Sequence, residues 1–172
     1  MTTINKADID NARCLSILGK QTFLESHGMS APEKDVSNYV DSKFTKQVFK
    51  AELNNADNIF HIIYYNKTPV GYSKIILNSS QENIQIKGIT KLERLYILKE
   101  YHHLKLGLEL LNFNLDLSQK NQQTGIWLYV WIENHKAINF YKKAGFKIID
   151  KYNFKISETH SNPNHQMLLI YN

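Results

Sequence analysis

The chain has 172 residues, of which 42% are hydrophobic and 22% charged, and this size and composition fit one compact domain rather than two. Its formal net charge of +5 favours an acidic or phosphorylated partner, but the lysines are dispersed, so a nucleic-acid partner is not required. The single cysteine, Cys14, excludes an internal disulfide and offers no metal-ligand spacing. No apolar run approaches the ~20 residues that a membrane-spanning helix needs. We therefore expect one domain over residues 1–172, soluble and cytoplasmic, with no membrane partner and no metal.

The first third of the chain is predicted to be helical. Apolar residues recur at helical spacing after Asp8 or Asp10, and this helix should end near Gly28. Pro32 opens a second predicted helix that extends to Phe44, and a short third one follows over 46–53.

From Ile59 onward, β-branched and aromatic residues predict strands. A hairpin around the turn NKTP comes first, then a strand over 86–97, a helix over 107–119 and a buried strand, IWLYVWI. A helix over 134–144, a strand over 146–156, a loop over 157–165 and a last strand in HQMLLIY complete the chain. This order predicts an α/β or α+β fold with a mixed central sheet.

The stretch LERLYILKEYHHLKLGLELL, from Leu92 to Leu111, reads as a strand, a polar turn and a helix. Unpaired N–H groups and the helix dipole at such a helix start favour an anion such as phosphate. Gly107 is the residue of the turn that takes positive φ freely, and His102, His103 and Lys105 add donors or charge. An ordinary solvated loop explains the stretch equally well, because one glycine is a weak phosphate signal.

A second stretch, ENHKAINFYKKAGF, places Asn134 at a strand end and Tyr141 two helical turns later. Both side chains can then face one groove, where a phenol is able to donate a proton to a leaving group. On spacing alone, a capping Asn134 and a packed Tyr141 are the simpler explanation.

Together the two stretches resemble the GNAT superfamily of N-acetyltransferases, which use acetyl coenzyme A (acetyl-CoA). The second stretch matches the signature N-x-x-A-x-x-x-Y-x-x-x-G-F at Asn134, Ala137, Tyr141, Gly145 and Phe146. The flanks, including QTFLESHGMSAPEKDVSNYVDSKFT and NKTPVGYSKI, resemble the PaiA-like branch, which is associated with acetylation of spermidine and spermine. The resemblance implies a GNAT fold with a mixed sheet of about six to seven strands and about four to five helices.

The first stretch departs from the family pattern Gln/Arg-x-x-Gly-x-Gly/Ala in two places. His102 replaces Gln or Arg, and Lys105 replaces the first glycine. We expect the loss of this glycine to strain the turn by about 1 kcal/mol, while the ammonium of Lys105 adds attraction to the pyrophosphate.

The resemblance also implies which groups bind the cofactor. Backbone groups of Leu95 and Ile97 would pair with the pantetheine arm, while Tyr96 between them directs its side chain to the core. The loop amides that would hold the pyrophosphate are those of His102, His103, Leu104, Lys105, Leu106, Gly107 and Leu108. Asn134, with Ala137 of the same signature, would contact the arm.

For catalysis, the resemblance implies that Tyr141 protonates the departing thiolate. The acceptor amine must first lose a proton, and strand alternation places Glu93 on the face of Leu95 and Ile97 as the candidate base. A partnership of Glu93 with Arg94 or with a nearby lysine explains this carboxylate equally well.

The expected function is acetyl transfer from acetyl-CoA to a primary amine, with a polyamine such as spermidine or spermine as the preferred acceptor. Acidic residues of the helical part, which would supply countercharge to a polycation, are Glu25, Glu33, Asp35 and Asp41. Solvated helix faces explain the same acidic residues. Two alternatives remain: an acyl-CoA-binding regulatory protein with this fold, and an acetyltransferase for protein or peptide amines. A homodimer is possible, because mixed sheets expose edges.

Overall fold

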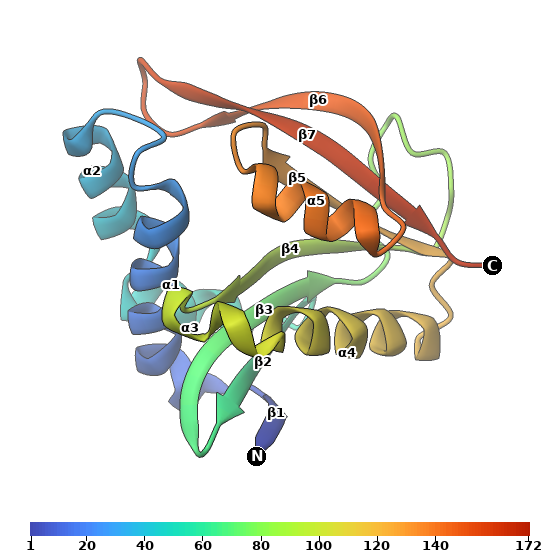
Figure 1. The fold of residues 1–172 in the computed structure, drawn as a ribbon, viewed down its shortest axis with the longest axis horizontal. Coiled ribbons are helices and arrows are strands. Elements are labelled where there is room, and N and C mark those ends of the chain that lie inside the picture. The colour runs from blue at the N-terminus through green and yellow to red at the C-terminus, as the bar shows by residue number, and fades with distance from the viewer.

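The computed structural model describes all residues from Met1 to Asn172, and one seven-stranded sheet in the order β1-β2-β3-β4-β5-β7-β6 organises them (Figure 1). The strands are β1 (Thr2–Lys6), β2 (Asn58–Tyr65), β3 (Thr68–Ile76), β4 (Ile89–Ile97), β5 (Gly125–Trp131), β6 (Lys147–Lys155) and β7 (Ser161–Ile170). The helices are α1 (Ala12–His27), α2 (Glu33–Lys43), α3 (Lys46–Asn54), α4 (Leu106–Lys120) and α5 (His135–Lys143), with 3-10 turns η1 (Ile9–Asn11) and η2 (Lys99–Leu104). None of these helices combines the length and the apolar character needed to cross a membrane.

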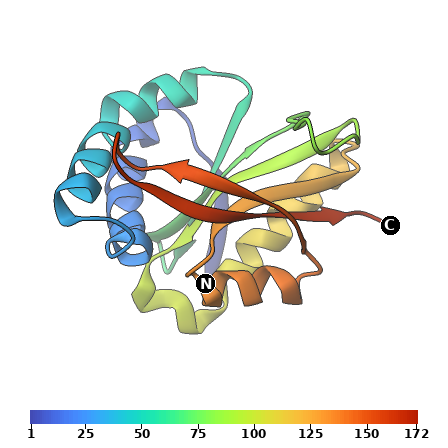
Figure 2. The ribbon, with the colours of Figure 1, turned by 90° about the horizontal axis from the view of Figure 1, so that it is seen from above.

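Helices cover both faces of the sheet, α1 to α3 on one side and α4 and α5 on the other (Figure 2). On the first face the aromatic side chains of Phe23, Phe44 and Phe49 pack on Phe60 and Tyr72. On the second face, apolar residues of α4 and α5 pack on β3, β4 and β5. The helices contribute Leu111, Ile138 and Tyr141, and the strands contribute Ile75, Leu92, Ile126, Leu128 and Val130. The mixed sheet between two helical layers confirms the predicted fold class.

β4 and β5 are the only parallel neighbours in the sheet, and they pair over a short distance. Residues 89–91 lie opposite residues 125–127, after which the strands continue to Ile97 and Trp131 without pairing with each other. β4 keeps its antiparallel partner β3, and β5 keeps β7. The two strands therefore separate in the middle of the sheet and expose their facing edges.

β4 also contains an irregularity that the sequence did not reveal. Lys74 of β3 lies opposite Arg94, and the next residue, Ile75, lies opposite Leu92, so Glu93 has no partner on β3. Such a bulge shifts the alternation of side chains along the strand. Leu92 and Leu95 consequently share the face that packs on α4 and α5.

The secondary-structure prediction was wrong in three places. β1 was not predicted, because its sequence TTINK is polar, and it forms an edge strand in which Ile4 alone packs on the core. Part of the expected loop 157–165 belongs to β7, which begins at Ser161 and pairs with the whole of β6. The third predicted strand begins later than expected, at Ile89 rather than residue 86.

Candidate active site

A cavity of about 1040 Å³ opens where β4 and β5 separate. Both strands line it, together with α1, α2, α5, the start of α4 and parts of β6 and β7. The predicted site residues that line it are Glu93, Leu95, Tyr96, Ile97, His102, Lys105, Gly107, Leu108, Asn134, Ala137 and Tyr141. His103, Leu104 and Leu106 do not line it, and Leu106 instead packs in the core with Ile63 and Val70. The fold thus brings both sequence stretches to one cavity.

The turn before α4 has a different shape from the predicted one. Lys105, and not Gly107, takes the left-handed conformation, with φ of 57° and ψ of 18°. Gly107 lies inside α4, which begins at Leu106. The prediction was wrong here because the helix starts earlier than the glycine suggested. The strained position is therefore the one where Lys105 replaces the first glycine of the family pattern.

Some of the backbone N–H groups at the start of α4 already form hydrogen bonds within the helix. The N–H groups of Leu108 and Glu109 donate to the carbonyl of Lys105 at 3.0 and 3.2 Å. The amides of Leu106 and Gly107 precede them at the helix start, where N–H groups have no partner within the helix. The anion-binding amides of α4 are thus fewer than the predicted run, which extended to Leu108.

His102 links this turn to its surroundings on both sides. Lys136 Nζ lies 3.0 Å from His102 Nδ1, and His102 Nε2 lies 2.9 Å from the carbonyl of Ile97. An ammonium can only donate, so Nδ1 accepts and Nε2 carries the hydrogen that Ile97 receives. The His102 ring therefore joins η2 to α5 and contacts a carbonyl that was expected to pair with the pantetheine arm.

Positive charge gathers around the start of α4. The ammonium groups of Lys105, which precedes α4, and of Lys136, which contacts His102, belong to exposed residues that line the cavity. Together with the helix N-terminus they form a donor set that suits a polyanion. The chemistry of these residues fits the pyrophosphate and phosphate groups of coenzyme A.

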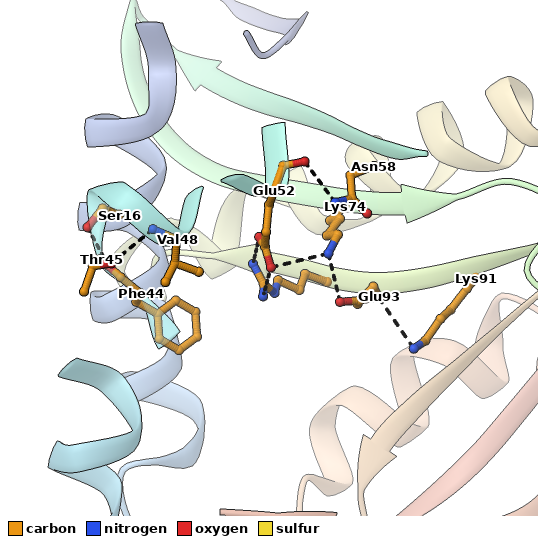
Figure 3. A network of polar contacts seen from close by, with 10 residues as sticks. Ser16, Phe44, Thr45, Val48, Glu52, Asn58, Lys74, Lys91 and Glu93 are labelled. Atoms are coloured by element: carbon orange, nitrogen blue, oxygen red, sulfur yellow. Dashed lines mark hydrogen bonds and ion pairs between the residues drawn. The ribbon is translucent and has the colours of Figure 1, made fainter. Parts of the chain in front are cut away.

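Glu93 belongs to a partly buried network of charges that joins α3, β3 and β4 (Figure 3). Lys74 Nζ donates to Glu93 Oε1 at 3.0 Å and lies 3.5 Å from Glu52 Oε1. Arg94 donates two hydrogen bonds to the Glu52 carboxylate, at 2.9 and 3.0 Å. Lys91 Nζ lies 3.5 Å from Glu93 Oε2. Two carboxylates thus share three cations.

This network changes what was expected of Glu93. Because of the bulge, Glu93 does not share a face with Leu95, and its carboxylate points to Lys74 on the side of α1 to α3. Its partners are Lys74 and Lys91, not Arg94. Burial alone would raise the pKa of Glu93, but the two ammonium groups outweigh it and hold the pKa below its usual value. Glu93 is therefore an ionised carboxylate at neutral pH.

Asn134 and Tyr141 lie on α5 and both line the cavity. The amide oxygen of Asn134 accepts from the N–H of Ala137 at 3.1 Å, which confirms its capping position. Tyr141 is 8% exposed, and burial, with a smaller effect of Tyr96, raises the pKa of its phenol well above the usual value. The phenol therefore keeps its proton at any physiological pH and can act as a proton donor.

An aromatic wall on the opposite side of the cavity was not predicted. It consists of residues from α1, α2, β4, β5 and β6, namely Phe23, His27, Tyr39, Phe44, Tyr96, Trp131 and Phe154. Burial lowers the pKa of His27 from 6.5 to about 4, so the imidazole is neutral. The spacing of Phe23 and His27 on one helix face was the available sequence signal, and their rings stack at 4.8 Å.

The acidic residues expected to attract a polycation are not gathered here. Glu25 lines the cavity, whereas Glu33, Asp35 and Asp41 do not. Asp41 lies 3.7 Å from Lys20 on the outer surface, and Asp35 accepts from Ser157 Oγ.

Comparison with known proteins reveals relatives with one activity in common. A model described as "Acetyltransferase (GNAT) family" matches residues 23–146. A spermidine N(1)-acetyltransferase from Thermoplasma acidophilum is 26% identical over 153 residues, which cover 86% of this chain and 89% of that protein. N-alpha-acetyltransferase 50 of Danio rerio is 31% identical over 111 residues, 64% of this chain and 61% of that protein.

Among solved structures, the PaiA N-acetyltransferase from Thermoplasma acidophilum in complex with coenzyme A has the same fold. Its TM-score is 0.79 at 22% identity, and the alignment covers 99% of both chains. This likeness supports the fold class.

Replacing Lys105 separates its strain from its charge. Lys105→Gly should relieve the left-handed conformation and stabilise the fold by ~1 kcal/mol, which is a rise of about 2–4 °C in Tm. The same change removes an ammonium, so the Kd for coenzyme A, measured by calorimetry, should rise a few-fold. Lys105→Gln, which keeps the strain, should weaken binding equally without raising Tm. Tighter binding by Lys105→Gly would show that strain dominates.

Proposed function

This chain belongs to the GNAT family of acetyltransferases, and from that membership we propose that its cavity catalyses acetyl transfer from acetyl-CoA to a small primary amine. The observation that supports this most is the cavity between β4 and β5, which joins the cationic start of α4 to the phenol of Tyr141. In this proposal the backbone N–H of Gly107 and the ammonium of Lys105 hold the pyrophosphate. The edge of β4 near Leu95 and the cap at Asn134 hold the pantetheine arm.

Tyr141 is proposed to act as the general acid. Bound acetyl-CoA supplies an activated thioester, whose carbon–sulfur bond breaks as the amine nitrogen forms its bond to the carbonyl carbon. The departing sulfur then takes a proton from the phenol of Tyr141, and the phenolate regains a proton from the nitrogen, which must lose it to become the neutral amide. Burial supports this role, because it keeps the phenol protonated until a charged sulfur develops beside it.

Glu93 is proposed to accept the proton of the incoming amine. A free alkylammonium has a pKa of about 10, so it needs an acceptor at neutral pH. Glu93 is ionised and lines the cavity. Its two ammonium partners make it a weak base, so the proton must pass on to water.

A polyamine is the acceptor class that the family resemblance suggests, and the name of the spermidine N(1)-acetyltransferase relative supports it. The second candidate acceptor is the α-amine of a peptide. The relative named N-alpha-acetyltransferase 50 supports this candidate, as does the aromatic wall, which suits an apolar first residue.

Two further expectations belong to this proposal. Use of acetyl-CoA and a free thiol at Cys14 fit the cytoplasm, which we propose as the location. The outer edge strand β6 exposes Ile148, Ile149 and Tyr152, and a homodimer through this edge stays a prediction. Analytical ultracentrifugation measures the assembly directly.

The proposed function is tested by thiol release from acetyl-CoA with spermidine, a lysine peptide, a peptide with a free α-amine and an amino sugar as acceptors. We expect release with at least one amine and a mass increase of one acetyl group on that amine. Coenzyme A binding without release for any amine would favour the alternative of an acyl-CoA sensor.

Tyr141→Phe removes the proposed acid and keeps the ring. Turnover should fall by about 10²-fold or more, whereas the Kd for coenzyme A should change less than about twofold. The matched control is Tyr64→Phe, which removes a phenol outside the cavity and should leave turnover unchanged. An unaltered rate in Tyr141→Phe would remove this residue from the mechanism.

Glu93→Gln should change the pH profile of turnover. The pKa of Glu93 lies below its usual 4.5, so its titration adds no limb to the wild-type profile between pH 6 and 9. Without the carboxylate, the amine must lose its proton to solvent, so turnover at pH 7 should fall about tenfold and recover toward pH 9. Glu109→Gln on the exposed start of α4 is the control. A profile parallel to wild type would assign the proton transfer to water alone.

A further inference from the structure

The side of the cavity away from α4 and α5 carries a cluster of aromatic and imidazole rings, and polar side chains such as Thr22, Ser26, Asn162 and Asn164 also line the cavity. Ring centroids lie 5.0 Å apart for Phe23 and Tyr39, 5.8 Å for His27 and Trp131, and 6.0 Å for Tyr39 and Phe154. These contacts connect α1, α2, β5 and β6 into one continuous wall. Since the proposed cofactor uses the side of α4 and α5, this wall remains for the acceptor.

Two of the three carboxylates that line the cavity are already paired with cations. Glu52 is engaged by Arg94 and Lys74, and Glu93 by Lys74 and Lys91. These two carboxylates therefore face three cations, which leaves an excess of one positive charge beside the wall.

Glu25 is the remaining carboxylate, and it lies at the exposed rim. One of its oxygens accepts from the backbone N–H of Lys99 at 2.8 Å, and the other accepts from Gln21 at 3.1 Å. Lys43 of α2 also lines the cavity, and it has no ion-pair partner. Glu25 is thus the one unpaired carboxylate of the cavity, and exposed lysines that include Lys43 and Lys99 line the same cavity.

We infer that the acceptor is a small monoamine whose amine is attached to an aromatic or apolar body, and that a polycation is disfavoured; this rests on the proposed function. A single ammonium can approach the aromatic rings by cation–π contact and lose its proton, which desolvation promotes. The apolar body gains from burial against the wall.

A second ammonium has no equivalent place. It would remain charged beside Arg94, Lys91 and Lys43, because Glu52 and Glu93 are already paired with cations and the unpaired carboxylate, Glu25, lies at the exposed rim. Burying a charge without a countercharge is unfavourable. The same argument disfavours spermidine as the acceptor, because spermidine carries additional ammonium groups along its chain.

The test compares n-hexylamine with 1,6-diaminohexane, which have the same six-carbon chain and differ by one amine. With acetyl-CoA at saturation and low salt, kcat/KM per amine should be at least tenfold higher for n-hexylamine. 2-Phenylethylamine should equal or exceed n-hexylamine, and spermidine should resemble the diamine. A diamine or spermidine value equal to or above that of n-hexylamine would overturn the inference.

A peptide with N-terminal phenylalanine separates a small acceptor from a macromolecular one. We expect it to be used no better than 2-phenylethylamine. A tenfold preference for the peptide would overturn the small-molecule assignment.

Charge variants test the cause of the preference. Lys43→Glu places a free carboxylate at the cavity and should reduce the monoamine preference at least several-fold. Lys34→Glu makes the same charge change on α2 outside the cavity, and should leave the preference unchanged. Equal effects of the two variants would attribute the preference to net charge and overturn the role of the cavity.

Calorimetry with coenzyme A bound measures amine affinity without turnover. Tighter binding of n-hexylamine than of the diamine supports the inference, even if no amine releases thiol from acetyl-CoA. The absence of thiol release would then contradict only the proposed acetyl transfer. Tighter binding of the diamine would overturn the inference whatever the turnover.

Discussion

The early end of the pairing between β4 and β5 is the constraint on which the rest of the structure depends. Three residue pairs join the strands, and each strand then continues with its other neighbour. Backbone groups on the two facing edges are thereby released from the sheet, although buried backbone groups normally require partners. The cavity is the space between these edges, and α4 and α5 are placed to border it because each follows one of the separating strands.

The charge network beside this opening connects the helical layer to the sheet. Glu52 of α3 holds Arg94 of β4 in a two-bond contact, and Lys74 lies between Glu52 and Glu93. A buried ion pair stabilises little by itself, but loss of one partner leaves an uncompensated charge. The network therefore keeps α3 in place on β4 and keeps Glu93 ionised. It also makes this side of the cavity poorly suited to a second ammonium group.

Much of the fold could be predicted from local patterns. The amphipathic helices, the buried run IWLYVWI and the cap at Asn134 follow from period and residue type alone, and all are present. β1 escaped prediction because an edge strand needs few apolar residues. The start of β7 escaped because SNPN is polar, although Asn162 and Asn164 are buried against neighbouring segments.

For the site, the sequence by itself determined which residues are present: a phenol one heptad after a capping amide, and a strand that ends in a basic turn before a helix. Tertiary structure decided how they act. The bulge at Glu93 depends on register with β3, the left-handed conformation of Lys105 depends on where α4 begins, and the aromatic wall unites five elements that are distant in sequence. Local patterns carry no information on such long-range pairing, because register and packing are set by partners elsewhere in the chain.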